Sequence, residues 1–133
     1  MPREQRTIKK VLKINKKHYG DEHPETGKTL RSLGHALGTL GNYVKGKELL
    51  DRALEIMKKY YGKDQTETGM TLEKLGMVYA GLDKQEEALK CYQQAYTILA
   101  NCNMPEASRV KELMDKLDSN SIQSFTNLEK KKE

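Results

Sequence analysis

The chain contains one unit of sequence written twice, and this repetition limits the possible folds more than any other feature. When the sequence is shifted by 42 residues, Glu-Thr-Gly at 25–27 falls on the same tripeptide at 67–69, and Leu-Gly at 33–34 falls on Leu-Gly at 75–76. Further identities at the same offset are Leu30 with Leu72, Leu40 with Leu82, Ala53 with Ala95, Ile56 with Ile98, and Tyr19-Gly20 with Tyr61-Gly62. A period between about 20 and 50 residues is typical of a repeat protein, in which similar units stack side by side.

Apolar residues recur at helical spacing through most of the chain, and turn-forming residues separate these segments. Gly20 follows the first of them, where a left-handed C-terminal cap favours glycine, and Pro24 stands where the next helix begins. Asn101 and Asn103 take the place of this glycine after the fifth segment. The pattern predicts six helices, over residues 3–19, 24–40, 43–61, 66–80, 84–101 and 105–117.

The same pattern predicts one repeat domain over residues 1–118. We divide it into a half repeat at 3–22, full repeats at 23–64 and 65–104, and a capping helix at 105–118. The polar, lysine-rich residues 119–133 are expected to be a disordered tail.

Small residues recur in the middle of the predicted helices. Gly34 and Gly76 occupy the same place in the two copies, although glycine inside a helix costs roughly 1 kcal/mol relative to alanine. A cost that recurs at one place suggests that two helices approach closely there. The second helix of each pair offers matching small residues, which are Gly46 and Ala53 in the first copy and Ala88 and Ala95 in the second.

These motifs resemble those of a known repeat family. Leu-x-x-Leu-Gly-x-x-Leu at 30–37 and Leu-x-x-Leu-Gly-x-x-Tyr at 72–79 resemble the first-helix signature of a tetratricopeptide repeat, and residues 46–53 and 88–95 resemble its second helix. The 42-residue period and the Tyr-Gly-Asp-Glu-His-Pro link at 19–24 resemble the kinesin-light-chain and nephrocystin type of this repeat. The resemblance implies an all-α fold, a right-handed superhelix of antiparallel helix pairs with about six helices.

The charge of the chain is concentrated at one end. The net charge is +5, and residues 1–20 contain seven lysines and arginines against Glu4. A basic helix of this kind could bind RNA or an anionic surface. Its lysines lack interleaved aromatic residues, so a solvated helix face is the better interpretation, and we do not expect nucleic acid to be the partner.

The cysteines and the hydropathy pattern bear on location. Cys91 and Cys102 fall on one predicted helix, roughly 16 Å apart at about 1.5 Å rise per residue, which is beyond the reach of a disulfide. Unpaired thiols indicate a reducing compartment. No apolar run approaches the length of a membrane span, and the first residues lack the apolar core of a signal peptide. We therefore expect a cytoplasmic protein.

Nothing in the sequence predicts catalysis. The three histidines, His18, His23 and His35, have no metal-ligand spacing to the cysteines, and there is no CxxC motif or phosphate-binding glycine loop. The glycines alternate with leucines at helical spacing, which is typical of packing and turns. We expect a protein that is not an enzyme and has no cofactor or metal.

The resemblance also implies where a partner would bind. The first helix of each pair lines the concave surface of such an array, so its residues outside the core form the candidate site. We expect a protein or peptide ligand with acidic and apolar residues, whose carboxylates Lys28 and Arg31 would pair. A scaffold or adaptor would use such a groove. The candidate site consists of Lys28, Arg31, Ser32, His35, Thr39, Met70, Glu73, Lys74 and Met77.

One alternative concerns the N-terminal helix. It aligns with the second helix of a repeat whose first helix is missing, so its apolar face would be left exposed. Uncapped ends of repeat arrays stack on one another. The sequence therefore leaves open two partners for this face: the rest of a longer protein, or another copy of the chain in a structural module that forms homo-oligomers through its terminal helices.

Overall fold

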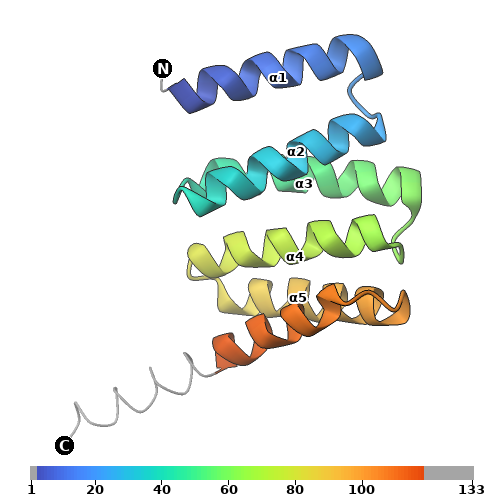
Figure 1. The fold of residues 1–133 in the computed structure, drawn as a ribbon. Helices are drawn as coiled ribbons and strands as arrows, with labels where there is room; N and C mark the ends of the chain where they lie inside the picture. Colours follow the sequence, from blue (N-terminus) through green and yellow to red (C-terminus); the bar gives the residue numbers. More distant parts are fainter. Residues whose placement is uncertain (1–2, 119–133) are drawn as a thin grey trace, which may run out of the picture.

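The computed structural model describes residues 3–118, which form an array of helices without a strand in this part of the chain. In Figure 1 the helices lie across the long axis of the array and alternate in direction, so that sequence neighbours are antiparallel. The five complete helices are α1 (Arg3–Tyr19), α2 (Pro24–Thr39), α3 (Tyr43–Tyr61), α4 (Thr66–Gly81) and α5 (Gln85–Asn101), followed by a helical segment at 106–118. The predicted all-α repeat array is confirmed over these residues. The predicted disordered tail at 119–133 lies outside the described residues.

The helices pack in pairs that stack on one another. α2 packs on α3 and α4 packs on α5, while α3 contacts α4, and α1 contacts α2. α2 also contacts α4 directly, because both lie on the near side of the array together with the segment 106–118 (Figure 1). The near side is therefore built from the first helix of each pair.

The predicted helix ends agree with the structure to within one residue. Gly20, Gly41 and Gly62 adopt positive φ angles of 87°, 91° and 101° between helices. Asn103 does the same at 56°, as predicted, whereas Asn101 is the last residue of α5 and does not take the place of the glycine. Asp83, at 61°, takes this role after α4, where the sequence has no glycine at the turn position itself.

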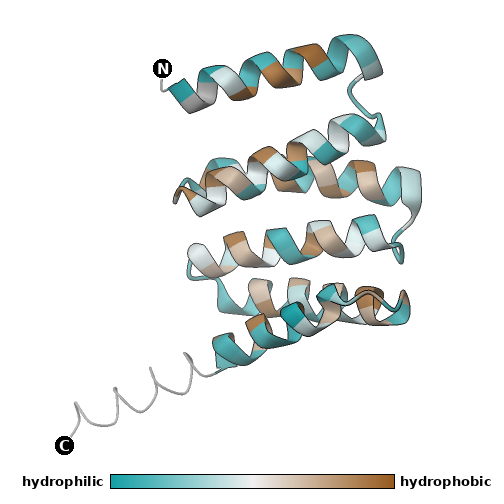
Figure 2. Ribbon diagram, viewed as in Figure 1, coloured by the Kyte–Doolittle hydropathy of each residue, from teal (hydrophilic) through white to brown (hydrophobic). Residues whose placement is uncertain are grey.

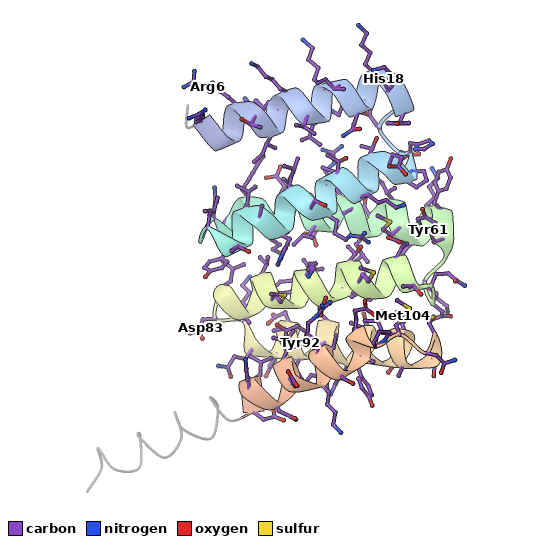
Figure 3. All side chains as sticks on the ribbon, in the orientation of Figure 1. Arg6, His18, Tyr61, Asp83, Tyr92 and Met104 are labelled. Carbon is purple, nitrogen blue, oxygen red and sulfur yellow. The ribbon has the colours of Figure 1, made fainter. Side chains whose placement is uncertain are left out.

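The close helix approach expected from the repeated glycines is confirmed. A Cβ atom on Gly34 would lie 2.9 Å from the carbonyl oxygen of Gly46 and 2.7 Å from Cγ of Leu50. In the second pair, a Cβ on Gly76 would lie 2.6 Å from the ring of Tyr92, a buried residue labelled in Figure 3. A side chain at Gly34 would push α2 away from α3, and one at Gly76 would push α4 away from α5.

The recurring Glu-Thr-Gly tripeptide also has a packing role. The Thr26 and Thr68 hydroxyls donate to the carbonyl oxygens of Gly20 and Gly62, each at 2.7 Å, and both threonines are fully buried. Each hydroxyl satisfies a carbonyl at the end of the preceding helix. The link between repeats is therefore fixed to the first turn of the next helix.

Replacing Thr68 with valine keeps the shape of the side chain and removes this hydrogen bond. We expect a loss of about 1 kcal/mol in the free energy of unfolding, because the part-buried carbonyl of Gly62 loses its donor. Urea denaturation followed by circular dichroism measures the change. Thr97→Val is the control, since Thr97 is an exposed residue whose hydroxyl bonds only within α5. Equal effects of both substitutions would contradict a special role for Thr68.

Candidate binding groove

The nine predicted site residues all lie on α2 or α4, on the side of the array where these helices run next to each other (Figure 1). They differ in exposure. Ser32 and Thr39 are exposed, Glu73 is fully buried, and the others are partly buried, namely Lys28, Arg31, His35, Met70, Lys74 and Met77. The predicted site is therefore one face of two neighbouring helices, with unequal access to a ligand.

Arg31 is engaged inside the array. Its Nη1 atom lies 2.7 Å from the Glu67 carboxylate, 3.3 Å from the Glu67 carbonyl oxygen and 3.5 Å from the Thr71 hydroxyl. The side chain is only 14% exposed. Its charge is neutralised by α4, which argues against the predicted pairing of Arg31 with a ligand carboxylate. Its contacts join the first repeat to the second.

Glu73 is likewise unsuited to contact a ligand, because its side chain is fully buried. Arg109, from the segment 106–118, donates to both carboxylate oxygens, through Nε at 2.6 Å and Nη2 at 2.8 Å. Lys74 lies 3.5 Å from the same carboxylate. The hydrogen bonds that Arg109 donates to the Glu73 carboxylate raise the pKa of Arg109. Since an unpaired buried carboxylate is strongly unfavourable, this ion pair holds α4 to the segment 106–118.

The two ion pairs occupy equivalent positions with opposite polarity. A shift of 42 residues places Arg31 on Glu73 and Glu67 on Arg109, and in both pairs the partners are 36 residues apart. We call these two pairs the charge ladder. The charge ladder was not predicted from the sequence, although opposite charges at this separation in neighbouring repeats were a detectable signal.

A hollow of about 490 Å³ lies between the C-terminal halves of α2 and α4. It brings together His35, Thr39 and Met77 from the predicted site. Tyr43, at the start of α3, also lines it and was not predicted, because its position at a helix start gave no sign that its ring lies against Gly81. The remaining lining residues are mostly small or apolar, namely Gly38, Val78, Ala80 and Gly81. This hollow can accept an apolar side chain.

Positive charge lies beside the hollow. Burial of the imidazole lowers the pKa of His35, and the positive charges of Lys74 and, to a smaller extent, Arg109 lower it further. The negative charge of Glu73 raises it in part. His35 is therefore mainly neutral at pH 7. The charges that act on His35 are those of Lys74 and Arg109, which are positive, and that of Glu73, which is negative, so the local balance at His35 is positive, while the Glu106 carboxylate acts on Arg109. A ligand carboxylate next to His35 and Lys74 would be stabilised by that charge.

A comparison with protein families agrees with the repeat fold. A family model described as Tetratricopeptide repeat matches residues 28–101, which include α3, α4, α5 and most of α2. The chain belongs to the tetratricopeptide repeat family. Proteins of this family are in general non-catalytic modules for protein–protein interaction. No curated protein matches the chain significantly.

The described part of this tetratricopeptide repeat protein contains no group of three or more His, Cys, Asp or Glu residues that could hold a metal ion. None of the helices in residues 3–118 is long and apolar enough to cross a membrane. Cys91 and Cys102 are free thiols, and burial raises the pKa of Cys91 to about 11. A thiol with so high a pKa is a poor nucleophile at neutral pH.

Proposed function

We propose that this tetratricopeptide repeat protein is a scaffold or adaptor module that binds an acidic and apolar peptide along α2 and α4. The observation that carries the proposal is the apolar hollow, where the local charge balance at His35 is positive. An apolar ligand side chain would occupy the hollow, and a neighbouring carboxylate would pair with Lys74. Lys74 and His35 thus replace Arg31 as the residues that recognise acid.

The rest of the groove supports an extended ligand. Ser32 is exposed on the same helix face, one turn before His35. Lys28 lies a further turn toward the start of α2, and its amino group is 3.7 Å from the exposed carboxylate of Glu25. So long and exposed an ion pair is weak, and a ligand carboxylate can compete for Lys28. The polar residues would set the orientation of the peptide, and the hollow would provide apolar contact.

Selection from a peptide library against the whole chain tests this proposal. We expect the selected peptides to combine Asp or Glu with apolar residues, and to bind the Lys74→Glu variant about tenfold more weakly because attraction becomes repulsion. Lys90→Glu is the matched control, since it makes the same charge change at an exposed position of α5. Selected peptides that are basic, or that respond equally to both variants, would refute the proposal.

The protonation of His35 gives a second prediction, measured with a selected acidic peptide. The ligand carboxylate favours protonated His35, so the pKa of His35 is higher in the complex than its lowered value in the free protein. Binding then takes up a proton. Affinity should rise as the pH falls through the pKa of His35 in the complex, and level off below the lower pKa of His35 in the free protein. His35→Gln should remove this dependence in titration calorimetry, and an unchanged profile would exclude His35 from the site.

A further inference from the structure

Within residues 3–118, the face shared by α1 and α2 has no covering helix, whereas the equivalent face of α3 and α4 has one. α1 aligns with α3 at the 42-residue offset, and α2 aligns with α4. The face of α3 and α4 is covered by α2, which contacts both. Among residues 3–118 no helix covers α1 and α2 in this way, and α1 forms one end of the array (Figure 1).

This open face has an apolar hollow of about 300 Å³ between the two helices. Leu40, which lines the hollow, is 69% exposed. Ile14 on α1 is 57% exposed and aligns with Ile56, which in the covered copy lies against Gly27 of α2. In Figure 2 hydrophobic segments are visible along α1, the helix at the end of the array. The hollow is lined mainly by Ile8, Leu33, Ala36, Leu37 and Leu40.

The internal repeat shows what kind of helix fits this hollow. In the covered copy, Gly34 of α2 rests against Leu50, where a Cβ would lie 2.7 Å from Cγ, and Gly38 rests against Val78, at 2.9 Å from Cγ2. Leu50 and Val78 align with Ile8 and Ala36, and both of these line the hollow. The hollow between α1 and α2 therefore corresponds to the surface of α3 and α4 on which Gly34 and Gly38 of α2 pack.

A polar site accompanies the apolar one. In the covered copy, Arg31 is held by Glu67 and Thr71, and the Thr71 hydroxyl donates to the Glu67 carbonyl oxygen at 2.8 Å. Glu25 and Thr29 align with these residues, and the Thr29 hydroxyl donates to the Glu25 carbonyl oxygen at 3.0 Å. The two residue types of α4 that bind Arg31 are thus present a second time on α2, where the Thr29 hydroxyl also accepts from Asn15 of α1 at 2.7 Å and Glu25 lies 3.7 Å from Lys28.

We propose that the face of α1 and α2 is the docking site for an amphipathic helix of a partner protein. The helix would have a basic residue followed by small residues three and seven positions later, as Arg31, Gly34 and Gly38 are spaced in α2. The basic residue would bind Glu25, and the small residues would pack on Ile8 and Ala36. Glu25 requires that the partner residue be positively charged, because Glu67 at the equivalent position accepts a hydrogen bond from Arg31.

A second copy of the chain does not supply this helix from its described residues. α2 has the required spacing, but it is packed between α3 and α4 in its own array. The segment 106–118 is more accessible and contains Arg109, yet Glu112 and Lys116 stand at the two positions that require small residues. These charged side chains would be forced against the apolar hollow, so the described residues of a second copy do not fit this site.

A labelled peptide with the sequence of residues 23–41 is the probe, and fluorescence anisotropy with the whole chain measures its binding. The peptide of residues 65–83 is the matched control, because Glu73 stands where Arg31 stands in the probe. We expect the probe to bind about tenfold more tightly than the control. Leu40→Asp, at an exposed position that lines the hollow, should weaken the probe, whereas Lys90→Glu, at an exposed position of α5, should leave it unchanged.

Charge reversal decides where the probe lies. Glu25→Arg should weaken the probe and improve binding of a probe that contains Arg31→Glu. A probe that displaces α2 from its own place would respond to Glu67→Arg instead of Glu25→Arg, and this result would overturn the proposal. Equal binding of the two peptides to the parent chain would overturn it as well.

Discussion

Replacing Arg109 with leucine is expected to lower the free energy of unfolding by about 3 kcal/mol. The substitution leaves the Glu73 carboxylate fully buried without its bidentate partner, and Lys74 at 3.5 Å compensates only in part. The structure expected to separate first is the segment 106–118, since this ion pair joins it to α4. Urea denaturation gives the free energy, and hydrogen exchange of the segment 106–118 shows where the loss occurs.

Two further variants separate the ion pair from other effects. Lys111→Leu is the control on the same segment, where an exposed lysine should contribute less than about 0.5 kcal/mol. The double substitution Glu73→Arg and Arg109→Glu should recover much of the loss, because it gives the pair the polarity that Arg31 and Glu67 already have in the first repeat. A double variant no more stable than its worse single variant would show that the two pairs are not equivalent.

Replacing Gly46 with valine is expected to lower the free energy of unfolding by about 3 kcal/mol. A Cβ at this position would lie 2.8 Å from the carbonyl oxygen of Gly34 and 3.2 Å from the backbone nitrogen of Gly38. Backbone atoms cannot move away by changing rotamer, so α2 and α3 must separate. The loss would exceed any gain from replacing glycine within a helix, which is about 1 kcal/mol at most.

Ser32→Val is the control for this substitution, because it introduces the same side chain at an exposed position of α2. Thermal unfolding followed by circular dichroism compares the two variants. We expect a clear decrease in melting temperature for Gly46→Val and a small change for Ser32→Val. Similar melting temperatures would mean that the two helices tolerate a wider separation than the structure indicates.

The fold could be predicted from the sequence because its determinants are local and occur twice. Gly34 and Gly76 lie where two helices approach too closely for a side chain, so they indicate the helix contacts. Gly20 has a positive φ angle that few other residues adopt, so it indicates a helix end. The membership in the tetratricopeptide repeat family follows from the same residues. The kinesin-light-chain and nephrocystin subtype stays a prediction.

The candidate site was harder to predict, because a ligand contact depends on what the neighbouring helix already occupies. Arg31 and Glu73 have the right spacing for the groove, but each is bound by a residue 36 positions later in the chain. That pairing depends on how far one helix is displaced along the next, and helical periodicity contains no information on this displacement. His35 and Met77 fall together because both lie on the C-terminal halves of adjacent helices.

The charge ladder also determines how an array of this kind can grow. If residues 23–64 were duplicated in tandem, Arg31 of the first copy would meet Glu25 of the second, and the new junction would join opposite charges. If residues 65–106 were duplicated instead, Glu73 would meet Glu67, and a buried carboxylate would face another carboxylate. Gene duplication could therefore lengthen the array from its first repeat, whereas copies of its second repeat would be selected against unless a further substitution restored the pair.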